Sequence, residues 1–412
     1  MNLDRLKCVR IEGLRSVEDL VLTIDHLQVL IGENGAGKSS IIEAFEMLSL
    51  LASDQRFVVE FSARHGAIRD LLMRGAAEIR LSLRIESDLA LTTDGSNWPL
   101  EYKVVLRPTA NSPYPSIAEE RLMSGDREVV FSRQGAKAQI LTEETSIATA
   151  VGRRSKEVSA PSEASMLKFW GSDAPVEVER LRRMLEGFRI HVPFETRPTW
   201  SRPLNRDAAP SLRDLSQMEE SDRLSRGGLN LTAIFQQLNA EGARRHQEIL
   251  EDIQLGLGTD VLDFAIPLKG RFSELSLMFA GVGRVPSSQL SEGQLSFLGL
   301  VALRHFNDTK ATLVLFDEPE LHLNPALVVR AAGLFLELSK RVPVLLATHS
   351  EALFDSLDPV EHVRVLELAQ RKTVLRTLSK EKLAKWRTLY SSVGDARRDG
   401  RLEVLLAEPH PS

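Results

Sequence analysis

The sequence has a single cysteine, Cys8, among 412 residues. One cysteine cannot form an intramolecular disulfide, so a disulfide-stapled fold is excluded, as is a zinc site built on several cysteines. The longest apolar runs, such as 312–316 and 342–347, have the length of strands, far below the roughly 18 residues of a membrane-spanning helix. The first ten residues contain no apolar core of the kind found in secretory signals. These absences predict a cytoplasmic protein that does not contact a membrane.

An excess of one charge is also missing. Lys and Arg number 52 and Asp and Glu 57, which gives a net charge of −5 and an isoelectric point of about 6.1. No global attraction to nucleic acid follows, although a local basic patch would still permit DNA binding. Apolar residues make up 43% and charged residues 26% of the chain, which is typical of folded globular proteins. No internal repeat or sustained heptad pattern is present, so a long coiled coil is excluded.

A glycine-rich loop lies near the amino terminus. Residues 27–32 predict a buried strand, and residues 41–52 have apolar side chains at helical spacing. Between them stands GENGAGKSS, a full G-x-x-x-x-G-K-S phosphate-binding motif. The alternative is a glycine-rich turn at a helix start, but strand, loop and helix in this order are the context that the motif requires. The predicted nucleotide contacts are Gly32, Glu33, Asn34, Gly35, Ala36, Gly37, Lys38, Ser39 and Ser40.

The residue types of this loop explain the prediction. Glycines let successive backbone N–H groups turn toward phosphate oxygens, and the helix that follows adds the positive end of its dipole. Lys38 is expected to reach the β- and γ-phosphates as a surface-facing charge with no role in the core. The Ser39 hydroxyl is a candidate ligand for Mg²⁺.

A second motif is an apolar strand, 312–316, that ends in two acids. Asp317 is a candidate Mg²⁺ ligand, and Glu318 is a candidate base for an attacking water. Strands that end in acids are common, so this pattern gains its weight from the phosphate-binding loop that accompanies it.

Two further motifs follow the same order. Ser291 and Gly293 open an apolar helix in LSEGQ, where a serine N-cap and a glycine suit an approaching phosphate. Capping alone is the alternative. His349 lies just after the strand of residues 342–347 and is a candidate γ-phosphate contact. A lone histidine is usually structural, but here three nucleotide-site motifs precede it. The predicted contacts in LSEGQ are Ser291, Glu292, Gly293 and Gln294.

The rest of the chain predicts two insertions. Alternating segments with turn signals indicate antiparallel strands over 76–150, and the Ser/Ala/Gly-rich residues 150–174 suggest a loose surface link. Helical patterns dominate 175–255. The Pro-, Arg- and Ser-rich segment 195–228 predicts irregular structure, either a mobile loop or a charged partner surface. Strand–helix alternation returns after 260, and a closing helix is expected over 380–394.

In this order the motifs resemble the head of an ATP-binding cassette (ABC) ATPase. The phrases DEPELHLNP and ATHSEALFDSL resemble the RecF, structural-maintenance-of-chromosomes (SMC) and OLD-type ATPases rather than transporter cassettes. IEGLRSVEDLVL resembles the first strand pair of that group, which implies that Arg15 and Ser16 lie near the nucleotide. RHGAIRDLLMRGA resembles the stand-alone predicted ATPases of the AAA family in this clade.

The resemblance implies an α/β fold, namely a P-loop NTPase head of the ABC type with a mixed or parallel core sheet, an antiparallel β-lobe and a helical insertion lobe. The expected division is 1–75 for the first part of the core, 76–174 for the β-lobe and linker, 175–284 for the helical lobe and 285–412 for the second part of the core. Only 62 residues follow Ser350, so no fused Toprim nuclease is expected.

The resemblance also implies a mechanism. Two heads would sandwich two ATP molecules, so that Ser291 and Gly293 of one head meet the γ-phosphate held by Lys38 of the other. Lys38, Glu318 and His349 would be catalytic, with ATP and Mg²⁺ as cofactors and a homodimer as the working assembly.

Some family features are hard to place in this sequence. Transporter cassettes have an aspartate after the acidic pair, whereas this chain has Glu320, Leu321 and His322. Gln55 is the candidate for the glutamine of the Q-loop. No aromatic residue for adenine is evident.

The biological output is expected to come from a partner. The favoured partner is an effector such as a nuclease or toxin, controlled in bacterial anti-phage defence. The alternatives are a RecF-like ATPase of DNA repair or recombination and a nucleotide-gated scaffold with little turnover. A transporter subunit is disfavoured by DEPELHLNP and by the large insertion between the phosphate-binding loop and LSEGQ.

Overall fold

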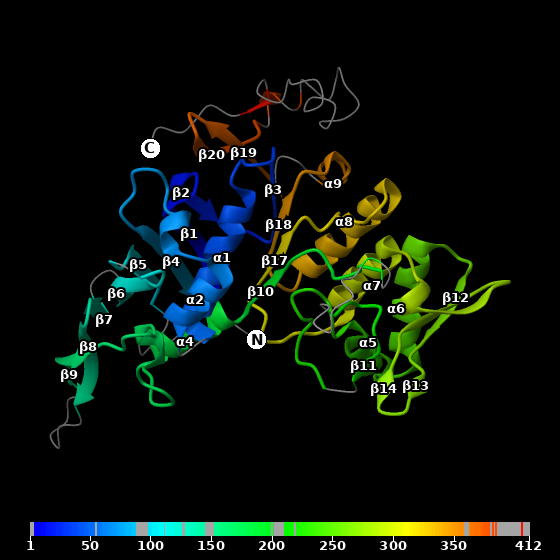
Figure 1. The fold of residues 1–412 in the computed structure, drawn as a ribbon, viewed down its shortest axis with the longest axis horizontal. Helices are drawn as coiled ribbons and strands as arrows, with labels where there is room; N and C mark the ends of the chain where they lie inside the picture. Colours follow the sequence, from blue (N-terminus) through cyan, green and yellow to red (C-terminus); the bar gives the residue numbers. More distant parts are fainter. Residues whose placement is uncertain are drawn as a thin grey trace.

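The structure, a computed structural model, has an α/β architecture with two large sheets (Figure 1). It describes residues 4–53, 56–87, 98–110, 112–125, 128–144, 152–198, 201, 210–217, 220–357, 362–379, 381–382, 384 and 405–406. Gln55 and most of the predicted helix at 380–394 lie outside the described residues. Within the described part of the chain, no helix combines the length and apolar character needed to cross a membrane.

The core sheet is mixed, as the sequence predicts. Neighbouring strands are parallel from β10 through β17, β18 and β3 to β19, and only the β19–β20 pair is antiparallel. In spatial order its strands are β10 (Phe188–His191), β17 (Leu313–Asp317), β18 (Val344–Thr348), β3 (Leu27–Gly32), β19 (Val363–Ala369) and β20 (Lys372–Thr377). The carboxyl ends of β3, β17 and β18 therefore lie together at one edge of the sheet.

Both faces of this sheet are covered, which explains why its central strands are apolar throughout. Side chains of one face, such as Leu30 and Leu315, belong to the same core as α1 (Lys38–Ser53). Side chains of the other face, such as Phe316, belong to the core of α7 (Glu292–His305) and α8 (Pro325–Ser339). Helices α1 and α7 therefore lie on opposite faces of the core sheet (Figure 1).

The strands over residues 76–150 are antiparallel, as predicted, and they form an eight-stranded sheet together with β1, β2 and β9. Its strands alternate buried and more exposed side chains, for example along β4, because one face packs on the core. In spatial order they are β2 (Val17–Thr23), β1 (Asp4–Leu14), β4 (Ile79–Ser87), β5 (Leu100–Pro108), β6 (Pro115–Ser124), β7 (Glu128–Gln134), β8 (Lys137–Glu144) and β9 (Gly152–Ser159). The helices α2 (Phe57–His65), α3 (Ile68–Leu71) and α4 (Val176–Glu186) and the 3-10 turn η1 (Met166–Lys168) accompany it.

The prediction of a loose surface link over 150–174 is wrong. Strand β9 and turn η1 lie in this range, and the Ser165 hydroxyl donates to the Leu51 carbonyl at 2.9 Å. The buried Arg133 guanidinium donates to the Ala164 carbonyl at 2.9 Å. Hydrogen bonds between side chains and main-chain carbonyls thus fix this segment to residues that are distant in the sequence, which its composition does not reveal.

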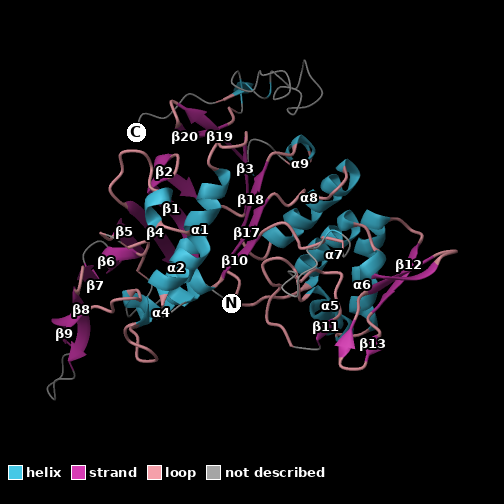
Figure 2. Cartoon of the chain, viewed as in Figure 1, coloured by secondary structure: helices cyan, strands magenta, loops and turns pink. Residues whose placement is uncertain are grey.

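The second insertion combines helices with two small sheets (Figure 2). Helices α5 (Leu231–Ala240) and α6 (Ala243–Leu257) pack in the same core as α7. The small sheets order as β11–β14–β13 and β12–β15–β16. Their strands are β11 (Ser216–Gln217), β12 (Val261–Ala265), β13 (Leu268–Lys269), β14 (Phe272–Ser273), β15 (Ser276–Phe279) and β16 (Gly283–Pro286). The 3-10 turn η3 (Ser287–Gln289) precedes α7, and helix α9 (Glu351–Asp355) follows β18.

The four-part division of the chain stays a prediction, and two sets of elements cross its boundaries. Strands β1 and β2 come from the first range but pair within the antiparallel sheet, and β10 comes from the range of the helical lobe but pairs with β17 in the core sheet. The described parts of 195–228 are mostly irregular, and Arg226 pairs with Glu46 of α1.

Candidate functional site

The phosphate-binding motif forms a tight turn between β3 and α1. Gly35 and Gly37 have φ of 82° and 101°, a conformation that glycine adopts without strain. The Ala36 N–H donates to the Glu33 carbonyl at 3.1 Å, and the Ile41 N–H donates to the Gly37 carbonyl at 3.1 Å. The turn therefore ends directly at the amino terminus of a 16-residue helix, where unpaired N–H groups and the helix dipole favour an anion.

Close neighbours explain two of the glycines. A Cβ on Gly32 would lie 2.5 Å from the Leu366 carbonyl oxygen, and one on Gly37 would clash with Thr373 of β20. A Cβ on Gly35 would have no neighbour within 4 Å. Strands β19 and β20 thus form one wall of the turn. Sequence reasoning missed Thr373, because no local pattern relates residues more than 330 positions apart.

Lys38 differs from its prediction. The side chain is buried, and Nζ donates to the carbonyls of Gly32 and Glu33 at 2.9 and 3.0 Å. The expectation of a surface-facing charge is therefore wrong, because the carbonyls of the tight turn converge on the ammonium group. The charge is held within the loop, where it would meet a bound phosphate.

Arg15 and Ser16 lie beside this loop. Arg15 has a φ of 53°, and its Nε donates to Glu43 Oε2 of α1 at 2.7 Å. This hydrogen bond raises the pKa of Arg15. Ser16 Oγ lies 2.8 Å from Thr373 Oγ1, and the Thr373 N–H donates to the Ser16 carbonyl at 2.8 Å. The β1–β2 turn is therefore tied both to α1 and to the wall of the loop.

The acidic pair ends β17, two strands away from β3. Ser39 Oγ lies 3.5 Å from Asp317 Oδ1, and burial raises the pKa of Asp317. A hydroxyl and a carboxylate are hard oxygen donors of the kind that Mg²⁺ prefers, so this pair fits the ion. Among the described residues, no group of three or more His, Cys, Asp or Glu side chains is placed to hold a metal. An ion at Ser39 and Asp317 would therefore need further oxygens from a nucleotide and water.

Glu318 and His349 are brought together. Glu318 has a φ of 50°, which is uncommon for a residue with a side chain and is often found at functional sites. Its N–H donates to the Ala347 carbonyl of β18 at 2.8 Å. His349 Nδ1 lies 3.6 Å from Glu318 Oε1. The strained backbone thus directs Glu318 toward the end of β18, where the histidine stands.

Ser291 caps the helix that LSEGQ opens. The Gln294 N–H donates to Ser291 Oγ at 3.2 Å, and the Ser291 N–H donates to Gln294 Oε1 at 2.8 Å. This is a complete capping box, so the capping role is met. A Cβ on Gly293 would lie 2.7 Å from the His322 carbonyl oxygen. His322 Nδ1 lies 3.4 Å from Glu292 Oε2.

The signature, as we call residues 291–294, lies at the same edge of the sheet as the phosphate-binding loop but on the other face. His322, its neighbour, follows the carboxyl end of β17. Helix α7 belongs to the core on one face and α1 to the core on the other. The Ser291 residue is exposed.

Comparisons with known proteins agree with this arrangement. The family model described as "AAA domain, putative AbiEii toxin, Type IV TA system" matches residues 204–355, and a second AAA-domain model matches residues 8–83. An Smc head bound to the C-winged helix domain of ScpA matches at 16% identity and a TM-score of 0.50, covering 92% of this chain and 99% of that chain. The sequence is thus similar to AAA-domain models over these two ranges, and the chain has the fold of an ABC-type ATPase head such as that of Smc.

Two further Smc heads are similar to this head at lower scores. The head from Pyrococcus furiosus with an extended coiled coil, bound to the C-terminal domain of ScpA, gives 15% identity and a TM-score of 0.49, covering 93% of this chain and 99% of that chain. The head from Thermotoga maritima gives 14% and 0.42, covering 91% and 99%. No curated protein matches the sequence significantly.

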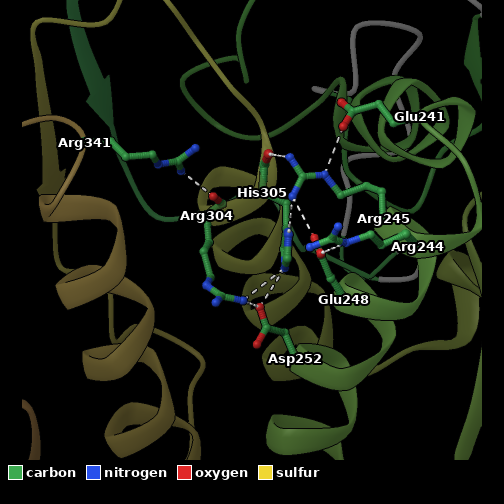
Figure 3. A network of polar contacts seen from close by, with 8 residues as sticks. All are labelled: Glu241, Arg244, Arg245, Glu248, Asp252, Arg304, His305 and Arg341. Atoms are coloured by element: carbon green, nitrogen blue, oxygen red, sulfur yellow. Dashed lines mark hydrogen bonds and ion pairs between the residues drawn. The ribbon is translucent and has the colours of Figure 1, made fainter.

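The signature helix of this head is also fastened at its far end (Figure 3). His305 Nε2 lies 2.7 Å from Asp252 Oδ2 of α6, and Arg304 pairs with the same carboxylate. Arg245 donates to the His305 carbonyl at 3.2 Å, and Arg341 donates to main-chain carbonyls of α7. Burial, with the nearby Arg304 and Arg245, lowers the pKa of His305 to about 4. Helix α7 is therefore tied to α6 through His305, Arg304 and Arg245, and to the segment after α8 through Arg341.

Glu320 is a second residue that sequence reasoning missed. Its Oε1 accepts from Thr348 Oγ1 at 2.6 Å and from the His349 N–H at 3.1 Å. A signal was present in the sequence, because transporter cassettes have an aspartate after the acidic pair and this chain has Glu320 in the matching stretch. The sequence alone did not indicate which group the Glu320 side chain contacts.

Proposed function

We propose that this head binds ATP with Mg²⁺ and hydrolyses it. The observation that supports this best is the convergence of three chemical groups at the carboxyl edge of β3, β17 and β18. These are the loop that holds Lys38, the acids Asp317 and Glu318, and His349. Each group comes from a different strand end, and parallel strands place such ends together.

The residues divide the work by their chemistry. Lys38 and the N–H groups at the start of α1 would bind the β- and γ-phosphates. Ser39 and Asp317 would hold the Mg²⁺ ion, which when bound neutralises developing charge on the phosphates. Glu318 would accept a proton from the attacking water, since its carboxylate is 36% exposed. His349 would contact the γ-phosphate.

We also propose that a second copy of the head completes each site. The support is the position of the signature. Ser291 is exposed at the amino terminus of α7, on the face of the sheet opposite to α1. A serine hydroxyl and a helix terminus suit a phosphate, and in a two-head sandwich they would meet the nucleotide held by the Lys38 loop of the other copy.

Hydrolysis is tested by measuring phosphate release with Mg²⁺ and with excess chelator. We expect turnover that depends on Mg²⁺ and falls at least 100-fold in Glu318→Gln, because glutamine keeps the shape but cannot accept a proton. Light scattering should detect an ATP-bound dimer of Glu318→Gln. Wild-type turnover by this variant would remove Glu318 from the mechanism.

We propose, for the biological output, control of a partner effector such as a nuclease or toxin in anti-phage defence. The support is the toxin description of the family model and the ScpA domain seen on an Smc head. The RecF-like repair role predicts instead that DNA stimulates turnover. The scaffold role predicts ATP-dependent dimers with negligible phosphate release. Turnover measured with and without duplex DNA separates these three outcomes.

A further inference from the structure

The segment that follows the acidic pair bonds across to the end of β18. We propose that Glu320 is a positioning residue that holds the end of β18, and with it His349, in the orientation that hydrolysis needs. The proposal rests on the proposed function, because it concerns the same site. It adds to the proposed site a residue, Glu320, that has no role in the phosphate-binding loop, the acidic pair or the histidine motif.

One oxygen of Glu320 organises three consecutive residues. Oε1 accepts from Thr348 Oγ1 at 2.6 Å and from the His349 N–H at 3.1 Å. Thr348 Oγ1 in turn accepts from the Ser350 N–H at 2.9 Å. Charged acceptors make hydrogen bonds about twice as strong as neutral ones. The geometry of residues 348–350 thus depends on one carboxylate, and the turn that follows β18 is fixed at the point where His349 leaves the sheet.

Burial separates Glu320 from the candidate base. Its side chain is 9% exposed, against 36% for Glu318. The Oε2 atom of Glu320 is buried and has no hydrogen-bond partner. A buried carboxylate oxygen without a partner is costly, so fold stability alone is a poor reason for an acid at this position. Holding the histidine strand end through charge-assisted bonds is a better one.

The ring of His349 lies between the two acids. Its Nδ1 atom lies 3.6 Å from Glu318 Oε1 and 3.6 Å from Glu320 Oε1, which is too long for a hydrogen bond. Glu320 therefore acts through the main chain of His349 and through Thr348. It fixes the main chain of His349, from which the imidazole extends.

Substitution of Glu320 tests the proposal through turnover. We expect Glu320→Ala to lower kcat about 10-fold or more with KM for ATP within about 3-fold, because binding by the Lys38 loop is unaffected. Glu320→Gln should lose clearly less than Glu320→Ala, because its amide oxygen can accept the same two hydrogen bonds, although without the charge that strengthens them. A loss in Glu320→Gln as large as that in Glu318→Gln would make Glu320 a base and overturn the proposal.

Hydrogen exchange gives a readout that needs no ATP. In a peptide spanning 344–354, Glu320→Ala should exchange about 10-fold faster than wild type at residues 348–350, and Glu320→Gln should exchange at a rate between those of Glu320→Ala and wild type. Unchanged exchange in Glu320→Ala would show that the carboxylate does not hold His349, whether or not the protein hydrolyses ATP. Absence of wild-type turnover would instead refute the proposed function alone.

Thr348→Val provides a second variant if Glu320→Ala does not fold. It removes one donor to Glu320 and keeps the side-chain shape. Faster exchange at 348–350 together with a lower kcat supports the proposal, and wild-type values for both contradict it.

Discussion

Two corners of this head differ in how much of a site each contains. At the phosphate-binding corner, residues from β3, β17 and β18 meet. Lys38 contacts carbonyls of its own loop, and Asp317 and His349 each approach a residue of another segment. At the signature corner, Ser291 and Gln294 are satisfied by each other within one helix turn. The first corner is a set of convergent groups, and the second is a well-capped helix terminus.

This difference teaches what each corner can do alone. The first holds a lysine, a candidate ion ligand and a candidate base within one chain. The second offers a hydroxyl and a helix dipole, which suit a phosphate but supply no lysine, ion ligand or base. In the proposed ATP sandwich, the second corner would gain a function beyond capping.

The largest effect should come from the phosphate-binding corner. We expect Lys38→Ala to weaken ATP binding about 100-fold, which corresponds to about 2.7 kcal/mol, because a charged hydrogen-bond donor to phosphate is lost. Calorimetric titration with ATP measures it, and circular dichroism checks the fold. Lys340→Ala removes an exposed lysine paired with Glu337 and is the matched control. Equal affinity in both variants would contradict the role of Lys38.

The next effect concerns the far end of the signature helix. The pKa of buried His305 is about 4, below the ordinary value of about 6.5. Between these values the unfolded chain binds a proton that the folded chain does not, so stability is full above pH 6.5 and falls as the pH drops toward 4. This histidine should contribute a loss of about 2 kcal/mol between pH 7 and pH 5.

The measurement is the free energy of unfolding by urea at both pH values for wild type and His305→Gln. The difference between the two proteins isolates His305. Burial also lowers the pKa of His191 to about 4, which acts in the same direction, and raises the pKa of Glu120 to about 7, which acts in the opposite direction. An equal loss in both proteins would mean that His305 is not held neutral.

The third effect separates capping from phosphate contact at the signature. Ser291→Arg should lower turnover about 10-fold or more with ATP affinity within about 2-fold, because a bulky cation would block the phosphate of the other head. Ser291→Asn is the matched control, since asparagine is an equally good N-cap. If Ser291 only caps α7, Ser291→Arg should cost about 1 kcal/mol of stability and leave turnover unchanged.

Much of the phosphate-binding corner could be predicted from the sequence. The strand before Gly32, the helix after Lys38 and the strands that end at Asp317 and Thr348 follow from local periodicity, and the structure contains each of them. Their adjacency follows from a parallel sheet. Local patterns are enough here because each motif stands at the end of a regular element.

The contacts between distant segments could not be predicted. Thr373 packs against Gly37, and Glu320 bonds to Thr348 and His349, because the strand order of the sheet brings these segments together. The buried state of Lys38 depends on carbonyl directions in the turn, which residue types do not specify. The capping box of Ser291 was readable, since Ser-x-x-Gln is its sequence pattern.

The smallest effect concerns the wall of the loop. Thr373→Val removes the hydroxyl that lies 2.8 Å from Ser16 Oγ, so we expect a loss of about 1 kcal/mol of stability and a few-fold weaker ATP binding. Thr373→Ser keeps the hydroxyl and is the control. Thermal unfolding and calorimetric titration measure the two changes. If neither variant loses affinity for ATP, the wall formed by β19 and β20 does not shape the phosphate-binding loop.

The most direct test of the two-head mechanism is to mix two inactive variants, Lys38→Ala and Ser291→Arg, and to measure ATP turnover. In a mixed dimer, one composite site combines an intact loop from the Ser291→Arg chain with an intact signature from the Lys38→Ala chain. Pull-down of differently tagged chains confirms that the mixed dimer forms. We predict that activity returns on mixing to about a quarter of the wild-type rate, since about half of randomly paired dimers are mixed and each has one intact site. Normal turnover by Ser291→Arg alone, or no recovery in confirmed mixed dimers, would contradict sites shared between two heads.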